Sequence, residues 1–124
     1  MATIFNGTVH GDSPGISVTV NYEYVRDGAN MKYHFWGNTR LNSSGGWYTN
    51  NVRVKLYLNG SDIYTKDCKS SNKGWSINWD AGWHTVSNKT SGTTPFYFTA
   101  KDTQNSSWCN YTSSTYQLDV APAY

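Results

Sequence analysis

Residues 74–84 read GWSINWDAGWH and hold three of the six tryptophans of the 124-residue chain. From Trp75 to Asp80, large apolar residues alternate with small polar ones, and the side chains of a β-strand point alternately to the two faces of its sheet. The alternation predicts a strand in which Trp75 and Trp79 anchor a core; the alternative is a ligand platform. Trp83 follows the turn signal Asp80-Ala81-Gly82, so the alternation leaves its facing open and it keeps a role at the surface.

Alternation of the same kind recurs on both sides of this stretch. Residues 16–25, ISVTVNYEYV, place Ile, Val and Tyr on one face and polar residues on the other, which is typical of a half-buried strand. Asn59-Gly60 is a two-residue hairpin signal, because both central residues of such a turn need positive φ. The further strands that we expect lie near residues 3–9, 31–37, 51–59, 63–68, 84–88, 96–101 and 115–120.

The composition supports an all-β chain. Leucine is scarce and glutamate occurs once, as Glu23, whereas the chain has 10 tyrosines and 6 tryptophans. This balance favours strands over helices. We expect about seven to nine short strands separated by turn clusters, which indicates one domain over residues 1–124, folded as an antiparallel, Ig-like β-sandwich.

Charge and hydropathy exclude several classes of partner. The formal net charge is +2, which is too small and too dispersed to predict binding to nucleic acid. No apolar run approaches the roughly 18 residues of a membrane span, and no signal peptide is visible at the N-terminus. We therefore expect neither a nucleic-acid nor a membrane partner, and a chain that is made and folded in a cytoplasm or is an excised module.

The cysteines and histidines do not predict a zinc site. Cys68 and Cys109 are too far apart for a CxxC unit, and the chain has only 3 histidines, so a structural zinc ion is disfavoured. Whether the two cysteines form a disulfide stays open. We expect no cofactor, and a calcium ion held by loop aspartates and carbonyl groups stays open.

The sequence lacks the motifs of catalysis. A glycosidase needs two neighbouring carboxyl groups, but Glu23 is the only glutamate and turn chemistry explains most of the aspartates. No GxSxG elbow, P-loop or GxGxxG motif is present, and nothing marks a cysteine with a lowered pKa. We predict that the chain is not an enzyme.

Aromatic residues on a predicted outer sheet face are the first candidate for a binding site. If strands 31–37, 51–59, 96–101 and 115–120 share one sheet, its outward face carries Trp36, Tyr57 and Tyr97 together with His34 and Arg53. Flat aromatic rings stack on sugar rings, and nearby polar groups bond the hydroxyls. The alternatives are a subunit interface and ordinary cross-strand aromatic pairs.

Loop tryptophans are the second candidate. Trp47, Trp83 and Trp108 each lie beside Gly, Ser or Asn, which places them near predicted loop tips. Each is a candidate ligand-binding residue, and the alternative is a lid over the core.

Two segments resemble a known family. Residues 51–64, NVRVKLYLNGSDIY, and 84–100, HTVSNKTSGTTPFYFTA, resemble the immunoglobulin-like domains of tail-associated minor structural proteins of phages that infect Gram-positive bacteria. The resemblance covers about a third of the chain and rests on a hairpin and aromatic alternation that many sandwiches share. It implies a virion or cell-surface adhesion module without catalytic residues; the tryptophan-rich stretch and the two cysteines depart from its pattern.

Three functional hypotheses follow. The first is a phage tail or fibre module, located in the virion, that binds a bacterial cell-surface polysaccharide. The second is a structural domain that contacts other virion subunits, or a second copy of itself as a homo-oligomer, through its aromatic face. The third is a carbohydrate-binding module of a secreted glycan-degrading enzyme.

Overall fold

The computed structural model describes residues 2–9, 16–41, 51–69, 75–103 and 109–119, the first of these ranges by its backbone alone. Strands make up most of these ranges, and no helix occurs in them. The predicted all-β class is confirmed. The strands are β1 (Ala2–Val9), β2 (Ile16–Asp27), β3 (Asn30–Leu41), β4 (Val52–Leu58), β5 (Ser61–Cys68), β6 (Trp75–Val86), β7 (Thr93–Asp102), β8 (Asn110–Thr112) and β9 (Tyr116–Asp119).

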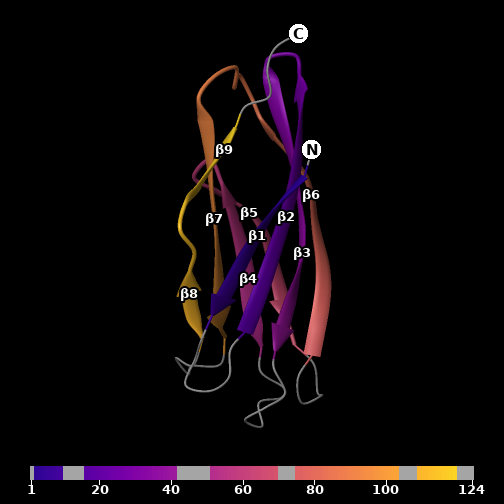
Figure 1. The fold of residues 1–124 in the computed structure, drawn as a ribbon, viewed down its shortest axis with the longest axis vertical. Coiled ribbons are helices and arrows are strands. Elements are labelled where there is room, and N and C mark those ends of the chain that lie inside the picture. Colours follow the sequence, from indigo (N-terminus) through magenta and orange to yellow (C-terminus); the bar gives the residue numbers. More distant parts are fainter. Residues whose placement is uncertain (1, 10–15, 42–50, 70–74, 104–108, 120–124) are drawn as a thin grey trace.

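The strands form two antiparallel sheets that pack face to face (Figure 1). One sheet has the order β1-β2-β3-β6, and the other has the order β5-β4-β7-β8, with β9 also paired to β7. Strands β8 and β9 occupy successive parts of the same edge of β7, at Thr99–Lys101 and Thr93–Phe96. Between them, Ser113 continues the ladder: its N–H donates to Phe98 O, and its Oγ accepts the Phe98 N–H, each at 2.9 Å.

The strand order is Ig-like. Apart from β1, the strands β2-β3-β6 face β5-β4-β7-β8, which corresponds to the A-B-E and C′-C-F-G sheets of immunoglobulin-type sandwiches. Strand β1 adds a further edge beside β2, with Ala2 opposite Glu23 and Val9 opposite Ile16. The predicted antiparallel β-sandwich is therefore confirmed.

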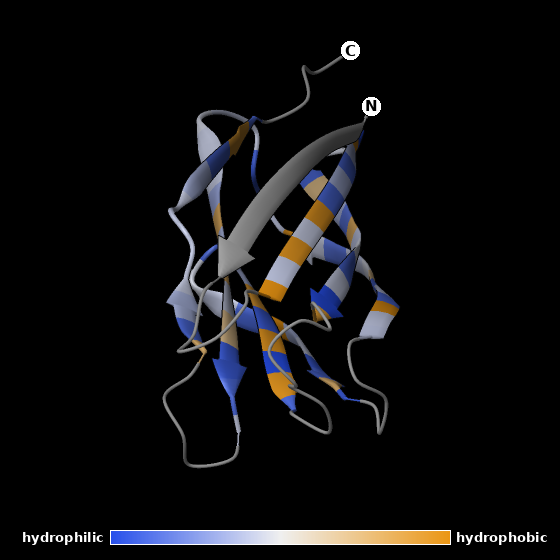
Figure 2. Cartoon of the chain, turned by 60° about the horizontal axis from the view of Figure 1, so that its bottom comes forward, coloured by the Kyte–Doolittle hydropathy of each residue, from blue (hydrophilic) through white to orange (hydrophobic). Residues whose placement is uncertain are grey.

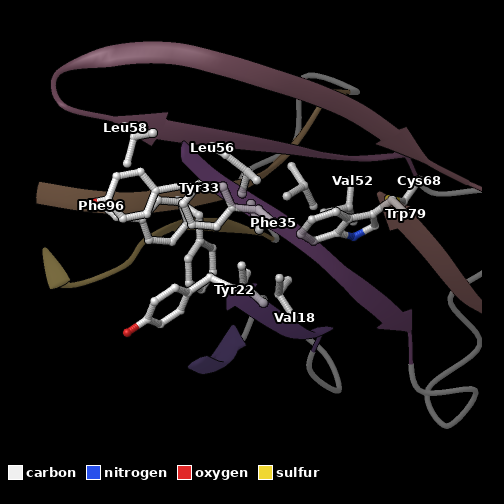
Figure 3. Packing of buried hydrophobic residues seen from close by; sticks show 14 of the residues in the cluster. Val18, Tyr22, Tyr33, Phe35, Val52, Leu56, Leu58, Cys68, Trp79 and Phe96 are labelled. Atoms are coloured by element: carbon white, nitrogen blue, oxygen red, sulfur yellow. The ribbon is translucent and has the colours of Figure 1, made fainter. Parts of the chain in front are cut away.

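The core lies between the sheets and is unusually aromatic. Figure 2 shows the alternating apolar and polar bands along the strands, and Figure 3 shows the buried side chains that these bands supply. Phe35 of β3 and Phe96 of β7 stack across the two sheets, with ring centroids 4.4 Å apart and planes 10° apart. Tyr33 is also fully buried, and its hydroxyl lies 2.9 Å from Thr94 Oγ1, so that the polar tip of the ring is satisfied.

The structure separates the three tryptophans of the 74–84 stretch. Trp75 and Trp79 are 8% and 5% exposed and belong to the core. The indole N–H of Trp79 donates to Thr39 Oγ1 at 3.1 Å, and its ring lies at one end of the cluster in Figure 3. Trp83 is 51% exposed. The prediction that Trp75 and Trp79 anchor the core is confirmed, and Trp83, whose facing the alternation left open, lies at the surface.

The predicted Asn59-Gly60 hairpin is confirmed. It joins β4 to β5, with φ values of 53° and 83°. Both residues have the positive φ that such a turn requires.

Candidate functional site

The outer face of the β1-β2-β3-β6 sheet carries the candidate site. Residues that pair across β2, β3 and β6 project from the same face and form rows. The register sets these rows as Thr19–Asn38–Asn78, Asn21–Trp36–Asp80 and Glu23–His34–Trp83. Two indoles, an imidazole, two carboxylates and three amides therefore gather on one surface.

A β-bulge in β6 turns Trp83 toward this surface. Trp36 pairs with Asp80 but its neighbour Phe35 pairs with Gly82, so Ala81 is an extra residue in β6. Gly82 adopts a φ of +74°, as a glycine at a bulge often does. Because side chains alternate along a strand, the extra residue shifts the alternation by one. If the same residues formed a regular strand with no bulge, Trp83 would point into the core with Trp79.

The structure therefore corrects the predicted turn at Asp80-Ala81-Gly82. These residues do not end the strand; they form the bulge within β6, which continues to Val86. The N–H of Gly82 donates to Oδ1 of Asp80 at 2.8 Å. Turns and bulges both favour Asp and Gly, which is why the sequence pattern did not separate them.

His34 is the centre of the site. Its ring stacks against two indoles, with centroids 4.8 Å from Trp36 and 5.1 Å from Trp83. Its Nδ1 lies 2.8 Å from Oε2 of Glu23, and its Nε2 lies 2.9 Å from Oδ1 of Asp80. The imidazole therefore contacts two indole rings and has a carboxylate at each of its two nitrogens.

The charges around His34 and Asp80 are mutually stabilising. Burial lowers the pKa of His34, but the hydrogen bonds and charges of Glu23 and Asp80 outweigh this and raise the pKa above its ordinary value of 6.5. The backbone N–H of Gly82, followed by His34, lowers the pKa of Asp80. Asp80 therefore stays ionised at neutral pH and is poorly suited to act as a proton donor.

An open groove of about 470 Å³ lies beside Trp36. Its other lining residues come from β2, β3 and β6: Asn21, Gly37, Asn38, Asn78, Trp79 and Asp80. One face of the Trp36 ring is covered by His34. The groove combines one aromatic wall with amide and carboxylate groups, and no Lys or Arg is among these residues.

The amides in the groove are held in fixed orientations. Nδ2 of Asn38 donates to Ser76 Oγ at 2.7 Å and to Asn78 Oδ1 at 2.8 Å. In this arrangement the groups of the pair that can still form hydrogen bonds to a ligand are Oδ1 of Asn38, an acceptor, and Nδ2 of Asn78, a donor. An acceptor and a donor on adjacent strands, next to an indole, suit a ligand that carries neighbouring hydroxyl groups.

The structure corrects the predicted single aromatic stripe. Trp36 and His34 lie on β3 in the first sheet, whereas Tyr57 and Tyr97 lie on β4 and β7 in the second sheet. The two groups therefore occupy opposite outer faces of the sandwich. Strand 31–37 does not share a sheet with strands 51–59, 96–101 and 115–120, because β3 pairs with β2 and β6.

The opposite face is a compact aromatic and charged surface. Tyr57 and Tyr97 stack with centroids 4.5 Å apart and planes 8° apart. Arg53 forms a two-pronged ion pair with Asp67, at 2.7 and 3.1 Å, and Lys55 pairs with Asp62 at 3.0 Å. Tyr57, Tyr97 and Arg53 therefore form cross-strand pairs of the kind that stabilise a sheet, and these pairs explain their presence on this face without a ligand.

The remaining predicted site residues divide in two. Trp83 joins the His34 cluster. Trp47 and Trp108 lie outside the described residues, so their part in a ligand site stays a prediction.

Several residues of the site were not among the predicted ones. They are Asn21, Glu23, Asn38, Asn78 and Asp80. Glu23 was a lone glutamate in a strand, and Asp80 was assigned to a turn. The signal that identifies them is the register across three strands, which a single strand's alternation does not contain.

Metal and thiol chemistry gain no support within the described ranges. No three His, Cys, Asp or Glu side chains gather there in a way that could hold a metal ion. Cys68 and Cys109 are buried and unpaired with each other, and burial raises the pKa of Cys109 to about 12. The described part of the chain contains no helix that is long and apolar enough to span a membrane.

Comparison of the chain with protein-family models, with curated proteins and with solved structures finds no match.

Proposed function

We propose that the chain is a non-enzymatic glycan-binding module, and that its binding surface is the Trp36 groove on the outer face of β2, β3 and β6. The observation that carries the proposal is the wall formed by Trp36 beside the ordered pair Asn38 and Asn78. Indole faces stack on the apolar face of a sugar ring, and fixed amide groups recognise its hydroxyls. Because the groove contains no Lys or Arg among its lining residues and includes the carboxylate of Asp80, we infer that the glycan carries no negative charge.

The setting follows from the sequence resemblance. In a phage tail or fibre, the ligand is a bacterial cell-surface polysaccharide and the module serves adhesion. In the alternative setting, the module belongs to a secreted glycan-degrading enzyme and directs it to its substrate. The neighbouring genes distinguish these two settings, because tail genes accompany the first and a catalytic domain accompanies the second.

A glycan array followed by titration calorimetry tests the binding site. We expect Trp36→Ala to weaken binding by about 30-fold, the effect of losing about 2 kcal/mol at an aromatic anchor. Tyr57→Ala is the matched control, because it removes an aromatic ring from the opposite face, and we expect it to bind as the wild type does. Absence of any bound glycan, or loss of binding in Tyr57→Ala alone, would contradict the proposal.

A second candidate function is a protein contact through the same sheet face. Val25 and Trp83 are 48% and 51% exposed, and both project outward from this sheet. An exposed apolar pair of this kind favours an interface with a neighbouring subunit or a second copy. Light scattering decides between the candidates: a stable oligomer that Trp83→Ser dissociates, together with an empty glycan array, favours assembly.

A further inference from the structure

His34 makes two contacts that require a proton on each of its two ring nitrogens. A carboxylate only accepts hydrogen bonds, and a neutral imidazole has a single N–H to donate. Yet both ring nitrogens lie within bonding distance of carboxylates, Nδ1 at 2.8 Å from Glu23 and Nε2 at 2.9 Å from Asp80. Both bonds form together only in the imidazolium ion.

The groups that face His34 from each neighbouring strand favour this ion. Strand β2 supplies Glu23, and β6 supplies Asp80. On β3 itself the nearest charge is Lys32, whose ammonium group pairs with Asp27 at 3.1 Å. The imidazole also stacks against the indoles of Trp36 and Trp83, and indoles attract a cation through their negative faces.

Two of these partners also belong to the groove. Trp36 forms its aromatic wall and Asp80 its edge. Loss of the proton removes one of the two carboxylate bonds and the attraction of the cation to both indoles. Asp80 keeps its bond from the Gly82 N–H, so the change falls mainly on the Trp36 ring and on the charge at the groove.

We propose that the proton on His34 holds the Trp36 groove in its binding form, so that glycan affinity falls as the pH rises and His34 becomes neutral. The ligand in this statement rests on the proposed function. The coupling between His34 and the Trp36 ring does not, because it exists in the free protein. The direction follows from the contacts. At lower pH His34 is charged, forms both carboxylate bonds and is attracted to both indoles. At higher pH it loses one of these bonds and the attraction. Because the pKa of His34 is raised above its ordinary value of 6.5, the charged form of His34 persists to a higher pH than in a free histidine.

An NMR titration of the free protein tests the coupling. We expect the His34 ring signals to titrate with a midpoint above 6.5, and the indole N–H signals of Trp36 and Trp83 to shift with the same midpoint. The signal of Trp79, which is buried and bonded to Thr39, should not follow it. A His34 midpoint at or below 6.5, or indoles that do not respond to it, would overturn the proposal.

Two substitutions identify the source of the effect. Glu23→Gln removes one carboxylate, so we expect the His34 midpoint to fall by about one pH unit. His84→Gln is the matched control, because His84 bonds to Ala81 O at 2.7 Å and, as the neighbour of Trp83 in β6, points to the opposite face of the sheet. It should leave the His34 midpoint and the indole response unchanged.

Binding measurements complete the test. For a glycan bound on the array, affinity one pH unit above the His34 midpoint should be about tenfold weaker than one unit below it. His34→Gln should remove this pH dependence, and affinity that is constant across the midpoint would overturn the proposal. If no glycan binds at either pH, the proposed function fails, and the NMR titration alone still decides whether His34 controls the groove.

Discussion

Gly37 lies in the middle of β3, at a position where no side chain fits. A Cβ atom there would lie 2.0 Å from the carbonyl oxygen of Thr19 and 2.8 Å from Cζ2 of Trp79. The first contact is with the backbone, which cannot rotate away. The bare backbone at residue 37 thus lets Trp79 enter the core beneath the groove.

We expect Gly37→Ala to lower the free energy of unfolding by about 3 kcal/mol, near the upper range for overpacking a core. Gly28→Ala is the matched control. Gly28 has a φ of +62° and nothing within 4 Å of its missing Cβ, so the backbone strain alone should cost about 1 kcal/mol. Urea unfolding measures both values, and equal losses in the two variants would show that the contact at residue 37 relaxes.

The bulge in β6 determines which side chains of this strand are buried in the core and which are exposed on the outer face of the sheet. The strand buries Trp75 and Trp79 before the bulge and Val86 after it. These three residues cannot share one face in an uninterrupted strand, because 79 and 86 differ by an odd number and side chains alternate. The extra residue at Ala81 reconciles the two halves and leaves Trp83 outside beside His34.

A deletion and an insertion at the bulge should differ in how much stability they cost. Deleting Ala81 restores a regular strand that keeps Trp79 inward and Trp83 outward, so the fold should persist with a loss of about 1 to 2 kcal/mol. Inserting one glycine after Ala81 points Val86 outward, so a larger loss is expected. Urea unfolding gives the losses, and acrylamide quenching reports the exposure of Trp83. A deletion variant that protects Trp83 would refute the role assigned to the bulge.

The same bulge shows where sequence reasoning is sufficient and where it is not. Alternation identified the strands around residues 16–25 and 31–37 and the inward facing of Trp75 and Trp79, because facing within one strand is a local property. The groove was not predictable in this way. It depends on which strands are neighbours and in which register, and the pairing of residues 15 to 46 positions apart, such as Asn21 with Trp36 or His34 with Asp80, leaves no local pattern.

At the scale of the whole molecule, the sheet order places the two cysteines far apart. Cys68 pairs with Val52, Val52 pairs with Asp102, and the Asp102 N–H donates to Cys109 O at 2.8 Å. Three successive strand spacings separate the cysteines by about 14 Å. A disulfide needs Cα atoms within about 7 Å. The question that the sequence left open is therefore answered: both thiols are free.

These two thiols report how the sandwich opens. Both are buried, burial raises the pKa of Cys109 to about 12 and also raises that of Cys68, and alkylation requires an exposed thiolate. We expect neither to react with iodoacetamide in the native state and both to react in urea, which mass spectrometry detects as two added groups.

Because Cys68 ends β5 and Cys109 precedes β8, they lie toward opposite edges of one sheet. If the sheet opens as one cooperative unit, the two native-state labelling rates should fall below the unfolded rates by the same factor, set by the global free energy of unfolding. Faster labelling of Cys109 alone would instead show that the β8 edge opens by itself.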